Sequence, residues 1–532
     1  MEVRAALDLG KFKTRGWSAQ YHKYARLGRA VVMWSRLFLI VLALFTVLYV
    51  GHIVALDVLP MIDLPYHLAA ATIYRDRDAP GNNLAEYYSV DVFPNPNISH
   101  LVFCGAEVFS SVETANKVYL CLYVVLLPLS VLLLIRKLRG DPWFTLLSFT
   151  VLYQYSFSWG FVGFTMSVPF VLFFFYGLLG HAENPSTSRR IVLSSLLLLL
   201  FYMHILSAVL CAAMLLLHCV AGGRTKFGRA AKDALILVPV LILIVVWRAS
   251  LPDGAEGLGV GTYYRSEYLP TLYRRAAFFF WDNFALYASV KGWIVAACFS
   301  IFIVHFPLVS WAKRRPSGKP WKLNLSTEHL LLVAVLLFYL ILPRRIPGTA
   351  HLYERFSVLV LLALILLGSR VVSQGRPRVM RIAIVGVCLL HFGLWTDYHV
   401  AFRADGSSFG REILPDGEGN GRLASLIFEP DFRGRPVYNH FQDYYTVWKR
   451  GVTVSKVGDF RYYPIRKKVS TTVLPIYNEW IGKWGRYDGR YRDMDYLLVK
   501  GTLPEGMREH VERFVEEEAA GDWRLYKKKE TF

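Results

Sequence analysis

The chain has 532 residues, of which 54% are hydrophobic and 15% aromatic, and its mean hydropathy is +0.35. This composition is too apolar for an ordinary soluble globular protein and indicates an integral membrane protein. The formal net charge of +20 fits basic loops that set the topology and contact anionic lipid, so no nucleic-acid binding is inferred from it.

The basic tail, residues 1–36, precedes the first long apolar run, Leu37 to Leu56. Short basic segments stay on the cytoplasmic side during insertion, so the N-terminus is expected in the cytoplasm. The run itself is about 20 residues long, whereas the apolar region of a cleavable signal peptide has about 7 to 15. We therefore interpret it as a signal anchor.

Apolar segments recur over residues 37–396, and we predict about eleven transmembrane helices in this core. The predicted spans are Leu37 to Leu56, Val118 to Ile135, Trp143 to Trp159, Phe161 to Leu179, Ile191 to Met203, Ile205 to Val220, Ala234 to Trp247, Trp293 to Trp311, His329 to Leu342, Ser357 to Leu367 and Ile382 to Trp395. The two halves beside His204 are short. They fit either a tight helical hairpin with His204 at its tip or one tilted or broken helix.

With the hairpin counted, basic clusters fall in the inside loops at residues 136–139, 189–190, 224–232, 313–315 and 376–381. The segments expected outside are the first loop 57–116, a loop over about 250–290, a short one at 343–356, and the tail 397–532. A transporter usually keeps its loops short, so this outside mass favours chemistry on the extracytoplasmic face. We expect a multi-pass protein of a bacterial inner membrane.

The tail 397–532 mixes charged and aromatic residues and has apolar runs of strand length, which predicts a small extracytoplasmic α/β domain. Its predicted elements, in order, are a strand at Arg435 to Asn439, a helix at Gln442 to Lys449, a buried strand at Tyr496 to Val499, an amphipathic helix at Met507 to Glu518 and a closing edge strand at Asp522 to Tyr526.

The segment Pro60 to Leu68, just after the first span, carries Asp63 and His67. Residues four apart share one face of a helix, and burying ionisable groups at a membrane surface is costly, so the pair indicates a site. Asp63 suits a general base, and His67 could orient it, share its proton or contact a phosphate. The alternative is an interfacial helix cap, with Asp63 preceding Pro65 in the first turn.

Arg344, Arg345 and Arg355 are expected outside at span ends, against the usual cytoplasmic bias of basic residues. Such a cluster suits an anion, and we assign these arginines, with Glu354 and His204, to substrate and phosphate binding. Arg355 is the first candidate. The alternatives are that the arginines reach lipid headgroups, that Arg355 pairs with Glu354, or that His204 is only a polar turn residue.

The order of these features resembles the GT-C superfamily of membrane glycosyltransferases, and the local matches are Asp63 to His67 and Tyr353 to Phe356. The resemblance implies an outside carboxylate that serves in catalysis and a sugar donor on a polyprenyl phosphate or pyrophosphate. The superfamily often shows two adjacent acids or a metal-binding acidic set in the first loop. Here Asp63 is flanked by Ile62 and Leu64, so a divalent metal remains open and no other cofactor is expected.

We therefore expect a polytopic α-helical, GT-C-like membrane protein that transfers a hexosyl or pentosyl group from a lipid-linked donor, with Asp63 and His67 as catalytic residues. Its expected partners are the donor, membrane lipids and an unidentified acceptor. One alternative is a transporter or flippase of a lipid-linked or anionic solute, although the halves of the chain show no internal repeat. Another is a non-catalytic membrane scaffold.

Overall fold

The computed structural model describes residues 17–221, 227–251, 272–279, 294, 297, 329–346, 349–370, 377–415, 421–459, 463–468, 474–475 and 489–529. The chain divides into two compact units, residues 1–49 and residues 50–532. The predicted span Trp293 to Trp311 lies outside the described residues except at two positions, and so does most of the loop predicted over 250–290. The predicted domain boundaries at 36 and 396 stay predictions.

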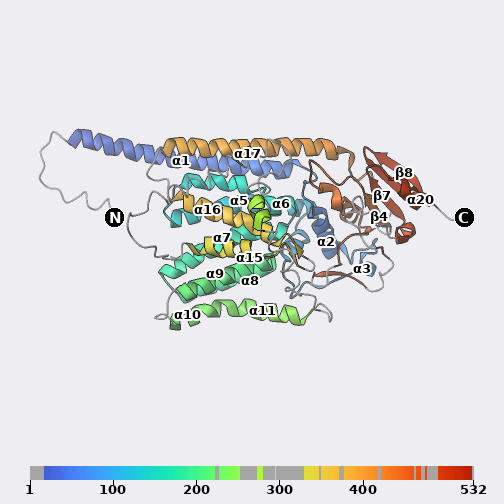
Figure 1. Ribbon diagram of the computed structural model, residues 1–532, viewed down its shortest axis with the longest axis horizontal. Coiled ribbons are helices and arrows are strands. Elements are labelled where there is room, and N and C mark those ends of the chain that lie inside the picture. The colour runs from blue at the N-terminus through green and yellow to red at the C-terminus, as the bar shows by residue number, and fades with distance from the viewer. Residues whose placement is uncertain are drawn as a thin grey trace. The chain divides into compact units, whose positions relative to one another are not determined.

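Six helical segments of the described chain are long and apolar enough to cross a membrane (Figure 1). They are Arg36–Ala55 in α1 (Trp17–Ala55), Val112–Lys137 (α5), Val162–Glu183 (α7), Gly228–Ala249 in α10 (Phe227–Ala234) and α11 (Val238–Ala249), Leu352–Ser369 (α16) and Arg378–Ser408 in α17 (Pro377–Asp405) and the turn after it. Two shorter apolar helices are Ile205–Val220 and α15 (Leu330–Ile341). The protein is thus a multi-span membrane protein, while the number eleven stays a prediction.

Helix α5 exposes one apolar stripe and buries the rest of its surface. The exposed side chains recur every three or four residues and are Val118, Leu122, Val125 and Leu129. Such spacing places them on one face of the helix, and the stripe is the kind of surface that lipid covers. Helix α11 likewise exposes Leu241, Ile242, Val245 and Val246.

The predicted span Trp143 to Trp159 is wrong as a single α-helix. The chain there forms a buried 3₁₀ helix, η1 (Pro142–Val151), followed by one turn, α6 (Tyr155–Ser158). In η1 the hydroxyls of Ser148 and Thr150 each donate, at 2.7 Å, to the carbonyl three residues earlier. These polar side chains compete for backbone acceptors, which favours the tighter winding over an α-helix.

The segment around His204 forms the predicted hairpin. Helix α8 (Thr187–Met203) and α9 (Ile205–Ala221) pack against each other, and His204 between them has extended dihedrals, φ −163° and ψ 117°. The first long loop, residues 57–116, braces this tip, because Asn97 accepts a hydrogen bond from the Ile205 N–H through its side-chain oxygen at 2.8 Å. The alternative of one tilted or broken helix is therefore excluded.

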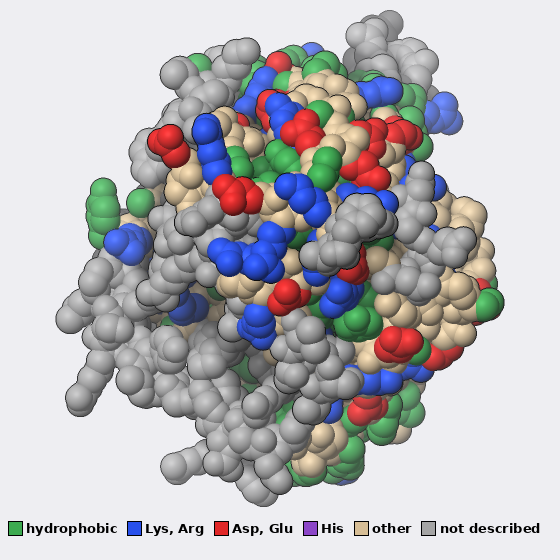
Figure 2. Space-filling model, turned by 90° about the vertical axis from the view of Figure 1, so that its right-hand side faces the viewer, with side chains coloured by type: hydrophobic (Ala, Val, Ile, Leu, Met, Phe, Trp, Pro, Cys, Tyr) green, Lys and Arg blue, Asp and Glu red, His purple; other side chains and the backbone are tan. Residues whose placement is uncertain are grey.

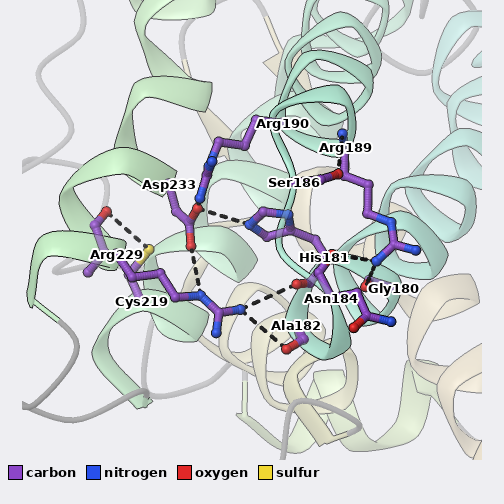
Figure 3. A network of polar contacts seen from close by, with 11 residues as sticks. Gly180, His181, Ala182, Asn184, Ser186, Arg189, Arg190, Cys219, Arg229 and Asp233 are labelled. Atoms are coloured by element: carbon purple, nitrogen blue, oxygen red, sulfur yellow. Dashed lines mark hydrogen bonds and ion pairs between the residues drawn. The ribbon is translucent and has the colours of Figure 1, made fainter.

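The ends of α7, α8 and α10 that lie near residues 181–190 and 229–233 are held by a network around Asp233, shown in Figure 3. Asp233 is buried and accepts hydrogen bonds from His181 Nε2 at 2.9 Å and Arg190 Nε at 2.8 Å, while Arg229 Nε lies 3.7 Å away. Arg229 also donates to the carbonyls of His181 and Ala182 at the end of α7. One carboxylate thus ties α7, α8 and α10 together.

The tail builds a five-stranded sheet in the order β5-β4-β7-β9-β8. Its strands are β4 (Arg422–Ile427), β5 (Val452–Thr453), β7 (Tyr496–Lys500), β8 (Phe514–Ala520) and β9 (Trp523–Lys528). Strand β4 runs parallel to β5 and β7, whereas β9 runs antiparallel to β7 and β8. The strand predicted at Tyr496 to Val499 is confirmed as buried β7. The strand predicted at the C-terminal end is confirmed as β9, but it is internal, and β8 lies at the edge.

Two other tail predictions need correction. The amphipathic helix expected at Met507 to Glu518 is wrong: a short helix, α20 (Arg508–Val511), gives way to β8, whose pairing with β9 outweighs the local helical preference of its glutamates. The strand expected at Arg435 to Asn439 is also wrong, because Val437–Asp443 forms a buried 3₁₀ helix, η9. The helix expected at Gln442 to Lys449 is confirmed in part as α18 (Tyr444–Lys449).

The tail is docked on the first long loop, residues 57–116, which contains α2 (Leu64–Asp76), α3 (Leu84–Tyr87), β1 (Tyr88–Val90) and α4 (Ser99–Cys104). Strand β1 pairs antiparallel with β6 (Ile465–Lys467) of the tail. Trp448 Nε1 donates to Glu113 at 2.9 Å, and Arg450 Nη2 lies 2.9 Å from Asp76. Figure 2 shows the face at this end of the molecule, where basic and acidic side chains are interspersed, as expected of a surface in water.

Candidate functional site

Asp63 is the residue before α2 and is held in place by its backbone. Its N–H donates to the Trp159 carbonyl at 2.9 Å, and the N–H of Ile62 donates to the Ser158 carbonyl at 3.1 Å. The Asp63 side chain makes no hydrogen bond to the first turn of α2, although Pro65 occupies that turn. The cap interpretation therefore lacks its defining contact, and the Asp63 carboxylate is partly exposed.

Gly160 allows the loop after α6 to approach Asp63. Its φ is +81°, a left-handed value that other residues rarely adopt. A Cβ on Gly160 would lie 2.9 Å from the Asp63 nitrogen and 2.8 Å from the Leu64 nitrogen. The glycine is thus required both for the turn and for the close approach that orients Asp63.

His67 lies one turn further along α2, and its N–H donates to the Asp63 carbonyl at 3.1 Å. Its ring packs edge-on against Tyr66 and His100, with centroid distances of 5.0 and 5.8 Å. Burial lowers the pKa of His67 well below its ordinary value, and the nearby charges of His100, His440 and Arg355 lower it further. A neutral imidazole at this position suits hydrogen bonding or proton transfer better than it suits holding a phosphate by charge.

Arg355, in the first turn of α16, is buried and held on several sides. Its Nη1 donates to His204 Nε2 at 3.1 Å and its Nη2 donates to the Ala350 carbonyl at 3.1 Å, while the guanidinium carbon lies 3.8 Å from the centre of the Phe161 ring. A guanidinium only donates, so His204 must present an unprotonated Nε2. Arg355 Nε has no partner in the described part of the chain.

The charges of Asp63 and Arg355 are close enough to interact, so we group the acid before α2 and the arginine of α16 in one candidate site. His204, which was also predicted for the site, accepts a hydrogen bond from Arg355 and so fixes the orientation of the guanidinium. For the alternative that Arg355 pairs with Glu354, the described residues show a different ion pair, in which Glu354 Oε1 lies 3.2 Å from Arg344 Nε, while the nearby Glu354 charge still acts on Arg355. Of these, Glu354 is buried and Arg344 is half-exposed.

Arg345 is exposed on β2 (Arg345–Ile346), which forms a short hairpin with β3 (Thr349–Ala350). This hairpin leads into His351, the residue before α16, which has a left-handed φ of +57°. His351 Nδ1 lies 2.6 Å from the Tyr155 hydroxyl and 3.6 Å from Glu354 Oε1. The hairpin and the first turn of α16 thus keep the Arg344–Glu354 pair close to Arg355, whereas Arg345 is exposed.

Two residues of the tail reach the site, and the sequence analysis missed both. His440, on η9, places Nε2 3.6 Å from Oδ1 of Asp63. Arg435 donates from Nη1 to the Ser158 hydroxyl at 3.0 Å, next to the loop that binds the Asp63 backbone. The available signal for His440 was the pattern over Tyr438 to Tyr444, where an aromatic residue recurs at every third position with two polar residues between. Polar residues in such an apolar segment are costly to bury unless they are used.

In the described residues, no group of three or more His, Cys, Asp or Glu side chains is placed to bind a metal ion. The candidate site consists instead of the Asp63 carboxylate, the imidazoles of His67 and of His440 in the tail, and the guanidinium group of Arg355, which is held in place by its hydrogen bonds. Such a set can take a proton near Asp63 and stabilise an anion near Arg355.

The comparisons add little to this geometry. No family model matches the sequence, and no curated protein matches it. One similar solved structure is the crystal structure of ArnT from Cupriavidus metallidurans in the apo state, with a TM-score of 0.49 and 12% sequence identity, over 93% of this chain and 98% of that one.

Proposed function

We propose that this chain is a membrane glycosyltransferase of GT-C type that transfers a sugar from a polyprenyl-phosphate donor to an acceptor on the extracytoplasmic face. The observation that carries the proposal is the interaction of Asp63, in the first outside loop, with the buried and oriented guanidinium of Arg355. One group suits removal of a proton, and the other suits a departing phosphate.

The proposed reaction assigns one task to each group. Asp63 takes the proton of the acceptor hydroxyl as its oxygen forms a bond to the anomeric carbon. The bond from that carbon to the phosphate oxygen breaks, and the polyprenyl phosphate leaves with the electron pair. Arg355 stabilises the phosphate, and its contacts with His204 and Ala350 hold it in place before the charge develops.

The surrounding residues have supporting tasks in this proposal. Arg344 neutralises Glu354 at the rim, so a buried carboxylate does not repel the donor phosphate. His67, with its lowered pKa, is a neutral hydrogen-bonding group beside the acceptor position. Arg345, being exposed, suits the lipid headgroup region or the outer part of the donor phosphate.

The Asp63→Asn variant tests the proposal in cells that lack the gene. Because the amide cannot take the proton, complementation with this variant should leave a glycosylated product missing and the polyprenyl-linked sugar accumulated. The control is Asp57→Asn, which removes an exposed acid of the same loop. Full product with Asp63→Asn would contradict the proposed chemistry.

The location of the accumulated donor separates the transferase from the flippase alternative. A transferase acts after the donor has reached the outer leaflet, so in spheroplasts the accumulated sugar should be oxidised by periodate, which does not cross the membrane. A flippase variant would leave the sugar in the inner leaflet, protected from periodate. Protection in the Asp63→Asn strain would favour the flippase.

A further inference from the structure

Arg435 stands at the end of a tight turn in the tail. The backbones of Phe432 and Arg435 exchange two hydrogen bonds, at 2.7 and 3.0 Å. The two residues between them, Arg433 and Gly434, have φ values of +47° and +76°, and both values are left-handed, as in a type I′ turn. The closed turn therefore fixes the backbone from which the Arg435 side chain extends.

The Arg435 side chain contacts both ends of α6. Its Nη1 donates to the Ser158 hydroxyl at 3.0 Å, and its guanidinium carbon lies 5.7 Å from the centre of the Tyr155 ring. The buried Ser158 hydroxyl in turn donates to the Tyr155 carbonyl at 2.9 Å. One guanidinium group of the tail thus contacts the first and the last residue of this helical turn.

The same turn holds the backbone of the candidate base. The Ser158 carbonyl accepts the Ile62 N–H at 3.1 Å, and the Trp159 carbonyl accepts the Asp63 N–H at 2.9 Å. Ser158 therefore binds Arg435 through its hydroxyl and Ile62 through its carbonyl. A helix of four residues is not stable by itself, so the position of α6 depends on contacts such as that with Arg435.

We propose that Arg435 is a positioning residue, which acts through Ser158 to hold Asp63 where it takes the proton of the acceptor. Five residues further along the tail, His440 faces the Asp63 carboxylate at 3.6 Å, so the tail supports both the backbone and the side chain of the acid. A displacement on the order of 1 Å in a catalytic group costs about 10²-fold in rate. This inference rests on the proposed function, in which Asp63 is the base.

The first test breaks the contact from either side. Arg435→Met removes the guanidinium and Ser158→Ala removes its acceptor, and each should slow product formation by about tenfold or more in membranes of the complemented strain. The product is the one that Asp63→Asn fails to form. The double variant should be no slower than the slower single variant, because both changes break one contact. Arg435→Lys still donates to Ser158 and should restore most of the rate.

The second test follows the backbone of Asp63 directly, by hydrogen exchange in the purified full-length protein. In Arg435→Met and in Ser158→Ala the amides of Ile62 and Asp63 should exchange faster by about tenfold or more, as read in peptides that span 61–64. The pairing of β1 with β6 should stay protected, because Arg435 does not contact either strand in the described structure. Thermal unfolding verifies that each variant is folded.

The matched control is Arg433→Met, which changes an exposed arginine of the same turn. Arg433 also ties the tail to the rest of the chain, since its Nη1 donates to Asp397 of α17 at 2.8 Å, but it does not contact α6 in the described residues. Rate and exchange should both stay at the wild-type values. An equal loss in Arg433→Met, or lost protection of β1 and β6 in Arg435→Met, would reduce Arg435 to a general docking contact and overturn the inference.

The remaining outcomes separate this inference from the proposed function. A slow Arg435→Met variant with unchanged exchange at Ile62 and Asp63 would overturn positioning and place Arg435 on the substrate. Faster exchange in Arg435→Met, combined with full product from Asp63→Asn, would support the backbone link and contradict the proposed catalysis. An inactive Asp63→Asn variant, with rate and exchange unchanged in Arg435→Met, would overturn only the role of Arg435.

Discussion

His440 Nε2 lies 3.6 Å from Asp63 Oδ1, and this contact joins the tail to the first long loop at the candidate site. The docking of η9 on α2 and the pairing of β1 with β6 hold the two segments in place. The site is therefore assembled from the first loop, the α6 turn, α16 and the tail, and none of these carries it alone.

His440→Asn should reduce transfer by about 10²-fold, because the variant loses the imidazole that faces the Asp63 carboxylate. Initial rates of product formation over a range of pH would measure this, and the pH profile should change with the rate because His440 interacts with the Asp63 charge. The control is His399→Asn, which changes a buried histidine of α17 that packs on His52 of α1 and not on the site. Equal rates for wild type and His440→Asn would show that His440 is only a packing residue.

Gly160→Ala should lower both activity and thermal stability. The added methyl would require a left-handed alanine and would press on the Asp63 nitrogen at 2.9 Å, so the carboxylate would move. A displacement on the order of 1 Å in a catalytic group costs about 10²-fold in rate. Gly180→Ala, at a helical glycine with nothing within 4 Å, should leave both measurements near the wild type. Unchanged activity in Gly160→Ala would show that this turn does not position Asp63.

The sequence predicted those parts of the site that local rules govern. Asp63 and His67 were indicated by their spacing next to a span, and Arg355 by its place against the usual distribution of charge. The extended His204 tip and buried β7 also followed from local patterns.

The remainder depends on contacts between distant segments. Arg435 to Asn439 alternates like a strand, but Arg435 donates to Ser158 of the α6 turn and the chain winds into η9 from Val437 onward. Glu516 and Glu518 favour a helix, yet pairing with β9 draws them into β8. No local pattern states that His440 would meet Asp63, since that contact exists only once the tail has docked.

Arg355→Lys should lower the rate of transfer by about 10²- to 10³-fold, because lysine carries the charge but not the planar fork that bonds His204 and Ala350 and stacks on Phe161. The loss should appear in kcat more than in KM if the arginine acts on the departing phosphate. Arg345→Lys keeps an exposed charge and is expected to change the rate less than twofold. Loss of rate in Arg345→Lys instead would place the phosphate at β2.

Asp443 should make the protein more stable as the pH falls through the range from about 6 to 4. Its pKa is raised from an ordinary 3.8 to about 6 by burial, so the folded protein takes up a proton in this range and the unfolded chain does not. The contribution amounts to about 3 kcal/mol. Asp443→Asn should therefore unfold at a higher temperature than the wild type at pH 7.5, and the difference should vanish near pH 4. A variant less stable than the wild type at both pH values would assign the carboxylate a structural role.

Asp233→Ala should destabilise the packing of α7, α8 and α10 around its network without changing the chemistry at Asp63. The substitution leaves His181 buried without its partner and removes the acceptor of Arg190, and breaking a buried pair costs about 3 to 5 kcal/mol. Thermal unfolding in detergent should show the loss, with kcat per folded molecule unchanged. Glu183→Ala removes an exposed ion pair with Lys137 at the same end, and such pairs contribute about 0 to 1 kcal/mol. If the two variants unfolded at the same temperature, the Asp233 network would be no more than a surface contact, and the packing of α7, α8 and α10 would have to rest on their apolar faces.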